Sequence, residues 1–127
     1  MLELSHKKLA AYKCSMDLCK EVYSLLKKFP SHEQFNLCSQ IRRAAVSICS
    51  NTAEGGSRES RKEKKRFYEI ARASLVELDT QLEISLIQGY FKKEEISDLE
   101  KYLESTFRLL SKMITTFRKP ENQAPTQ

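Results

Sequence analysis

The side chains with the clearest chemical potential are cationic and lie close together between residues 58 and 72. At about 100° per residue, five of them fall on one side of a helix. We call these five the basic stripe: Arg58, Arg61, Lys62, Lys65 and Arg72. A positive stripe on an exposed helix suits contact with the phosphates of a nucleic acid.

Acidic side chains interrupt the basic stripe. Glu59, Glu63 and Glu69 lie among the cations and neutralise part of their charge. Ion pairs between residues four apart would make the same segment an ordinary solvated helix face. We place nucleic-acid binding modestly ahead of this second interpretation.

The sequence offers little for catalysis. His6 and His32 are its two histidines, and both lie near expected helix starts. Phosphate-binding glycine loops, hydrolase serine motifs and zinc-protease histidine pairs are absent from the sequence. Glu77, Asp79 and Glu83 are better explained as ion-pair partners of cations on neighbouring helices than as an acid–base pair. We therefore expect a non-enzymatic protein with no cofactor and no metal site.

Net charge and cysteine usage indicate the kind of partner and the cellular compartment of the protein. A net charge of +5 and a pI near 9.0 favour anionic partners, such as nucleic acid or an anionic membrane surface. Its four cysteines form no C-x-x-C pair and mostly lie at or beside apolar helix positions, as small thiols do in a reducing compartment. The N-terminus lacks a signal-peptide pattern, and no apolar run approaches the length of a membrane span. These features predict a cytoplasmic protein without a membrane partner.

Apolar residues at steps of three and four predict four amphipathic helices. We expect the helices at residues 5–28, 31–54, 60–88 and 93–117. Short connections between such helices predict an all-α fold, an antiparallel up-down-up-down four-helix bundle. The bundle forms one domain over residues 1–119, followed by a disordered polar tail at 120–127.

Local signals mark the expected helix ends. Ser31 and Ser60 each begin a capping box, in which a side chain three residues later reaches back to the cap. Gly55 and Gly56 are expected to end the second helix in a left-handed conformation, and Gly89 to end the third.

The segment from Gln40 to Gly56 is the most informative stretch of the sequence. One face of its helix is apolar, whereas the opposite face is narrow, polar and built of small side chains that would allow close contact. The stretches Gln40–Ile48, Ser50–Asn51 and Ala53–Gly55 resemble the signature of the 23S rRNA intervening-sequence protein family, also called four-helix bundle proteins. Further matches occur at Phe29–Pro30, Arg58, Ser74–Leu82 and Gly89–Tyr90, so the resemblance covers about residues 9–118.

The resemblance implies a set of signature residues, and these are Arg42, Arg43, Asn51, Glu54, Gly55 and Glu77. One position departs from the pattern, because Cys49 stands where the family usually has proline. A helix with cysteine at this position should lack a proline-induced break.

The resemblance also implies an assembly and partners. The family is similar to the accessory variability determinant protein of diversity-generating retroelements, which forms a five-membered barrel and works with a reverse transcriptase and nucleic acid. Other members are encoded inside insertions in bacterial 23S rRNA genes. We therefore expect a ring-shaped homo-oligomer, a homopentamer by this resemblance, that associates with RNA or DNA and with a reverse transcriptase or another protein. The alternative is an interaction scaffold that binds an acidic protein and has no nucleic-acid role.

Two expectations concern particular surfaces. The first helix has two apolar stripes, so a single bundle should leave apolar surface exposed for self-association. Arg42 borders the apolar face of the second helix and could reach an acid on the third, such as Glu77.

Overall fold

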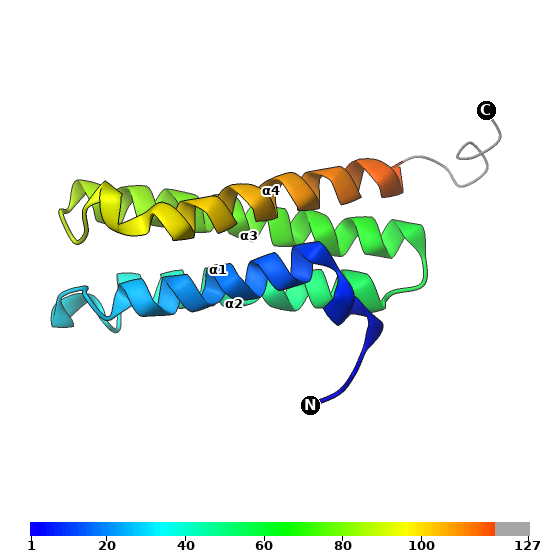
Figure 1. Ribbon diagram of the computed structural model, residues 1–127, viewed down its shortest axis with the longest axis horizontal. Coiled ribbons are helices and arrows are strands. Elements are labelled where there is room, and N and C mark those ends of the chain that lie inside the picture. Colours follow the sequence, from blue (N-terminus) through cyan, green and yellow to red (C-terminus); the bar gives the residue numbers. More distant parts are fainter. Residues whose placement is uncertain (119–127) are drawn as a thin grey trace.

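The structure is a computed structural model, and it describes residues 1–118. Four α-helices account for most of this part of the chain, and no strand occurs in it (Figure 1). The expected tail at 120–127 and the domain boundary at 119 lie outside the described residues. The helices are α1 (Ala10–Leu26), α2 (Leu37–Ser57), α3 (Arg61–Ile87) and α4 (Ser97–Arg118). Short 3₁₀ turns precede three of them, namely η1 (Ser5–Lys8), η2 (Ser31–Glu33) and η3 (Lys93–Ile96).

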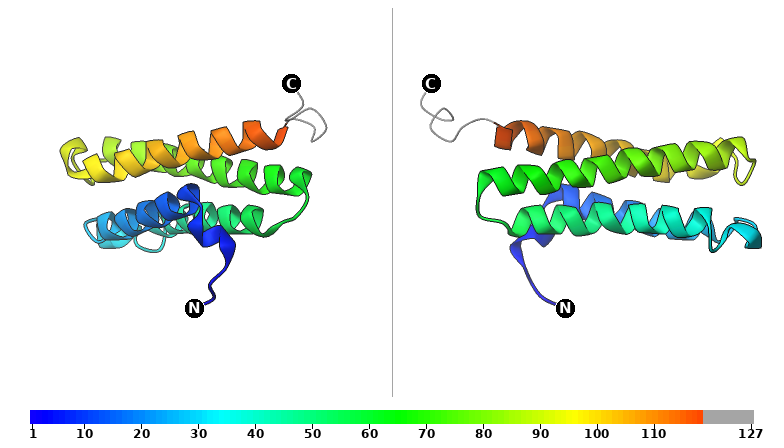
Figure 2. Two further views of the ribbon diagram at one scale, coloured as in Figure 1. Left: turned by 45° about the vertical axis from the view of Figure 1, so that its right-hand side comes forward. Right: turned by 180° about the vertical axis from the view of Figure 1, so that it is seen from behind.

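Each helix runs antiparallel to the next, and each packs against two neighbours. Helix α1 contacts α2 and α4, and α3 also contacts α2 and α4. The α1–α2 pair and the α3–α4 pair therefore form opposite sides of the bundle, as all views show (Figures 1 and 2). The predicted all-α four-helix bundle is confirmed for a single chain.

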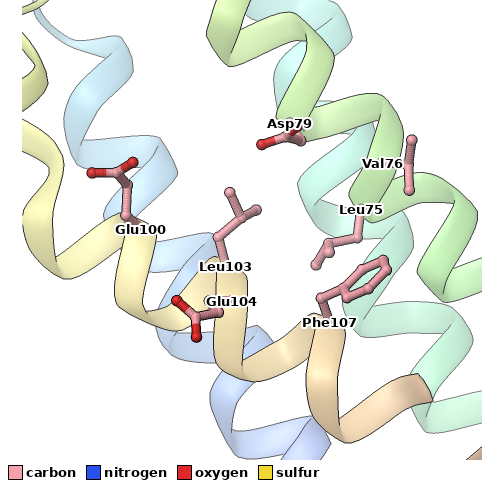
Figure 3. Close-up of a pocket in the computed structure, with 7 residues that line it drawn as sticks. All are labelled: Leu75, Val76, Asp79, Glu100, Leu103, Glu104 and Phe107. Atoms are coloured by element: carbon pink, nitrogen blue, oxygen red, sulfur yellow. The ribbon is translucent and has the colours of Figure 1, made fainter.

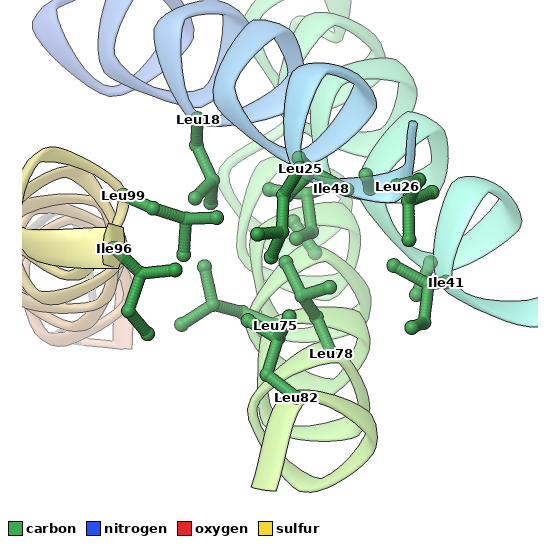
Figure 4. Packing of buried hydrophobic residues seen from close by; sticks show 14 of the residues in the cluster. Leu18, Leu25, Leu26, Ile41, Ile48, Leu75, Leu78, Leu82, Ile96 and Leu99 are labelled. Carbon is green, nitrogen blue, oxygen red and sulfur yellow. The ribbon is translucent and has the colours of Figure 1, made fainter. Parts of the chain in front are cut away.

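The core consists of the apolar positions that recur along each helix. Side chains from all four helices meet in its centre (Figure 4). The best-buried aliphatic residues include Leu18, Val22, Ile41, Ile48, Leu78, Leu99, Leu110 and Ile114. Burial of a leucine or isoleucine side chain of this kind contributes about 1.5–3 kcal/mol, so this periodicity is the main source of the fold.

The first helix is shorter than the sequence predicts. Leu9 has an extended conformation, with φ −65° and ψ 133°, and separates η1 from α1. His6 in η1 turns inward, where it is buried and packs edge-on against the ring of Tyr12 at 5.1 Å. At the other end α1 stops at Leu26 rather than at residue 28.

The capping box expected at Ser31 is wrong. The Ser31 side chain makes no cap hydrogen bond, and α2 starts six residues later, at Leu37. Gln34, the residue expected to complete the box, instead donates its amide to the carbonyls of Leu26 and Phe29 at 3.2 and 3.3 Å. These carbonyls lie at and just beyond the end of α1, where the regular helical hydrogen bonds stop; the Leu26 carbonyl also accepts from the N–H of Phe29 at 3.2 Å.

The left-handed helix end expected at Gly55 and Gly56 is also wrong. Both residues remain helical, and α2 continues to Ser57. Both glycines lie where another element approaches closely. A Cβ on Gly55 would lie 2.5 Å from Cε1 of Tyr68, and one on Gly56 would lie 2.6 Å from Cβ of His6.

The remaining helix ends agree better with expectation. Ser60 Oγ accepts a hydrogen bond from the backbone N–H of Glu63 at 3.0 Å, which confirms the N-cap of α3. Gly89 has φ 80° and is the one residue with positive φ among those described. The last helix begins as the turn η3, in which Glu95 Oε1 accepts from the N–H of Lys92 at 2.7 Å, and then runs to Arg118.

Candidate nucleic-acid interface

The first turns of α3 position most of the basic stripe at one end of the bundle. Arg61 lies across the C-terminal end of α4, where its Nη2 donates to the carbonyl of Thr116 at 2.9 Å. Its guanidinium also sits over the ring of Phe117, 5.1 Å from the centroid. A cation is favourable here because helix C-termini carry partial negative charge.

Arg72 lies on the same α4-facing side of α3. Its Nη1 donates to Ser111 Oγ at 3.2 Å, and its guanidinium is 6.0 Å from the centroid of the Phe107 ring. Lys65, four residues after Arg61, is on this side as well. Its Nζ lies 3.7 Å from Glu69 Oε2, in a partly exposed ion pair.

Arg58 does not belong to this surface. It is the C-cap of α2 and has an extended conformation, so the helical spacing that placed it in the basic stripe does not apply. Its guanidinium pairs with Glu54 Oε2 at 2.9 Å and stacks on Phe67 at 4.9 Å. Lys62 is helical and exposed and points further outward than Arg61 and Lys65. The structure therefore groups Arg61, Lys65 and Arg72, with Lys62 beside them and Arg58 apart. We call the four residues other than Arg58 the basic patch.

Two other cations near the stripe have structural contacts that the sequence did not suggest. Lys64 donates from Nζ to the carbonyls of Gly55 and Gly56, both at 3.3 Å, and so covers the C-terminal end of α2. Arg66 stacks on Phe67 at 5.6 Å. A signal for Lys64 exists in the sequence, because it precedes the buried Tyr68 and Ala71 by four and seven residues and so lies on the inward side of α3.

The net charge of the chain around the start of α3 is positive. Between Glu54 and Arg72 the cations outnumber the acids Glu54, Glu59, Glu63 and Glu69. The ion pairs formed here are partly exposed and joined by flexible side chains, so they leave the cations accessible to a stronger anionic ligand.

Two of the six signature residues, Asn51 and Gly55, lie at the α2–α3 contact. Asn51 donates from Nδ2 to the carbonyl and the hydroxyl of Ser47 at 2.9 and 3.0 Å. Ser47 Oγ in turn lies 2.8 Å from Ser74 Oγ of α3. The small polar face of α2 is thus partly a contact surface within the chain, and Gly55 extends it against Tyr68.

The expected pair between Arg42 and Glu77 does not form. Arg42 Nη2 donates to the carbonyl of Gln34 at 2.7 Å, because the irregular segment before α2 folds back beside it. Glu77 is exposed on α3, as Arg43 is on α2.

The cysteines pack between helices. Cys49 lies in the continuous helix α2 and donates its thiol to the carbonyl of Ser15 at 3.3 Å. When Cys19 ionises, the Cys49 thiol can donate to its thiolate instead, and this hydrogen bond lowers the pKa of Cys19 to about 7, against the effect of burial. Cys38 is buried, and Cys14 and Cys19 are half-buried.

The described residues contain neither a metal cluster nor a membrane span. Within residues 1–118 no three His, Cys, Asp or Glu side chains are arranged to hold a metal ion. In the same part of the chain, no helix is both long and apolar enough to cross a membrane.

The fold and this surface define a class: small antiparallel four-helix bundles with a cationic patch at one end. The family model described as 23S rRNA-intervening sequence protein matches residues 7–112. The chain belongs to this family, as the resemblance in the sequence indicated.

A solved structure supports the same fold. It is the 1.70 Å crystal structure of a protein from Bacteroides thetaiotaomicron VPI-5482, which is described as a member of the S23 ribosomal protein family with unknown function. The two chains share 22% sequence identity with a TM-score of 0.75, over 83% of this chain and 95% of the other. Comparison with curated proteins gives no match.

Proposed function

We propose that the protein is a non-enzymatic, cytoplasmic, nucleic-acid-associated bundle that works as a homo-oligomer. The observation that carries the proposal is the alignment of Arg61, Lys62, Lys65 and Arg72 along the N-terminal half of α3, in a chain of net charge +5. The family's description, which refers to 23S rRNA, supports a nucleic acid as the anionic partner.

The chemistry of the patch suits the phosphate backbone rather than the bases. Lys62 and Lys65 are flexible point charges that make no polar contact with another helix within residues 1–118, whereas the guanidiniums of Arg61 and Arg72 are oriented by Thr116 and Ser111. Such contacts carry little sequence information, so RNA and DNA should bind with similar affinity.

A salt titration tests this proposal. Binding of a fluorescent RNA to the wild-type protein should weaken steeply with salt, by about 0.7–0.9 logarithmic units per decade of salt for each phosphate contact. A DNA of equal length should give a similar slope. Absence of binding at low salt would overturn the proposal.

The alternative is a scaffold that binds an acidic protein and has no nucleic-acid role. One observation favours it: the cations already make contacts within the chain, such as Arg58 with Glu54 and Lys65 with Glu69. Prearranged side chains of this kind suit a specific protein surface. Retention of an acidic protein from lysate after nuclease treatment, without RNA or DNA binding by the purified chain, would favour this alternative.

Exposed apolar residues support self-association. Met16, Tyr23 and Val46 on one side of the bundle, and Val76 and Phe107 on the other, are each 42–52% exposed. Apolar groups gathered in this way commonly mark interfaces. The ring of five subunits follows from the family resemblance, and a monomer in light scattering at micromolar concentration would overturn self-association.

A further inference from the structure

A groove with acidic rims runs between α3 and α4, and one of its ends adjoins Arg72, whose guanidinium lies 6.0 Å from the centroid of the Phe107 ring. Leu75, Leu103 and Phe107 form its apolar floor, in a hollow of about 350 Å³ (Figure 3). Its rims carry Asp79 from α3 and Glu100 and Glu104 from α4. We call these residues, together with Val76, the acidic groove. No cationic side chain lines it.

The opposite side of the bundle has the reverse character. A shallow surface between α1 and α2 carries two arginines and no acid, and we call it the arginine face. Its residues are Tyr23, Ser39, Arg42, Arg43, Val46 and Ser47. Tyr23 and Val46 are 43% and 44% exposed, and Met16 extends the apolar surface seven residues before Tyr23 on α1.

We infer that the acidic groove receives the arginine face of a second copy of this chain. The inference rests on the self-association proposed above and names the two surfaces that make it. Each surface combines exposed apolar groups with charge of one sign, and the two signs are opposite. Glu100 is already paired with Lys93, but within residues 1–118 no ion pair engages Arg43, Asp79 or Glu104, so these three charges are available to a partner.

The placement of the surfaces fixes the kind of assembly. The α3–α4 pair and the α1–α2 pair lie on opposite sides of the bundle, so one chain cannot bring its own two surfaces together (Figures 1 and 2). Two copies would join head to tail, through different patches on each partner. Contacts of this type produce a ring when the rotation between copies closes, and a filament when it does not. An isologous dimer is disfavoured, because each surface would meet its own charge.

Charge reversal on each side, alone and combined, tests the inference. Arg43→Glu and Glu104→Lys each place like charges in contact, and each should weaken self-association by about tenfold or more in sedimentation velocity. The double variant Arg43→Glu/Glu104→Lys exchanges the signs and should recover most of the affinity. Lys112→Glu, an exposed reversal outside both surfaces, should leave the association unchanged. Circular dichroism confirms that each variant is folded.

The outcomes separate this inference from the proposed self-association. A monomeric wild type would overturn both. An oligomeric wild type with unaffected single variants, or a double variant as weak as the single ones, would overturn the assignment of these surfaces alone. Val46→Ser supplies an independent check, since removal of an exposed apolar group should weaken assembly without a change of charge.

Discussion

Gly55 of α2 lies directly beneath the ring of Tyr68 on α3, so close that a Cβ on Gly55 would be 2.5 Å from Cε1 of the ring. Tyr68 is 2% exposed and also packs against Phe117 of α4. The ring therefore has little room to move aside. This contact, rather than a helix end, explains why the signature contains glycine at this position.

Gly55→Ala tests the contact by the sign of its effect. In an unobstructed helix alanine is more favourable than glycine by about 0.8–1 kcal/mol. Here we expect destabilisation by about 1–3 kcal/mol, because the methyl group overpacks a buried ring. The free energy of unfolding in urea measures the difference. Gly56→Ala should cost less, because its neighbour His6 lies in the short turn η1 rather than in a long helix. A Gly55→Ala variant that is more stable than the wild type would contradict the account.

Arg42 and Glu77 should behave as independent residues. Arg42→Ala removes the hydrogen bond to the carbonyl of Gln34 and should cost about 1 kcal/mol. Glu77 is exposed, so Glu77→Ala should stay within about 0.5 kcal/mol of the wild type. Urea unfolding of both single variants and the double variant measures their coupling. A coupling free energy above about 0.5 kcal/mol would show that Arg42 and Glu77 interact after all, as the sequence suggested.

Tyr90 and Glu33 give a pH-dependent contribution to stability. The Tyr90 hydroxyl donates to Glu33 Oε2 at 2.7 Å, and this bond is the main reason that the pKa of Glu33 lies below its ordinary value of 4.5. A carboxyl group with a lowered folded-state pKa stabilises the fold above its unfolded pKa, and this contribution disappears as the pH falls through the folded value.

Tyr90→Phe should therefore be less stable than the wild type at pH 7, and the difference should shrink as the pH falls below about 4. The substitution keeps the ring that packs on Phe29 at a centroid distance of 5.2 Å. Urea midpoints between pH 7 and pH 3 measure the effect. A difference that does not vary with pH would assign the effect to packing.

The sequence predicts the bundle well because its four helices repeat apolar residues in register with the helical period. Leu18, Ile48, Leu78 and Leu110 are all buried where that period places them. The ends of helices are harder to predict, since distant partners decide them. Gln34 binds carbonyls at the end of α1 instead of completing a capping box with Ser31. At position 55 the close approach of Tyr68, rather than a helix end, requires glycine.

In and around the basic patch, too, local spacing predicts some positions correctly, whereas contacts between helices decide others. Arg61, Lys65 and Arg72 share one side of α3, as their spacing predicts. Arg58 does not share it, because the chain leaves the helical conformation between α2 and α3. The role of Lys64 at the end of α2 depends on a contact between helices that local spacing does not specify.

Binding of phosphates by the lysines of the basic patch is tested most directly by one titration. Lys62→Glu/Lys65→Glu is the informative variant, because both residues belong to the patch and neither anchors α3 to another helix. Lys13→Glu/Lys101→Glu is the control, with the same change of net charge at exposed positions elsewhere. RNA binding is measured by fluorescence anisotropy across a range of salt concentrations, with circular dichroism to verify folding. For the Lys62/Lys65 variant the account predicts weaker binding and a salt slope shallower by about 0.7–0.9 for each phosphate that is no longer bound, whereas the control should keep a nearly unchanged slope. Equal slopes for the wild type and both variants would contradict it.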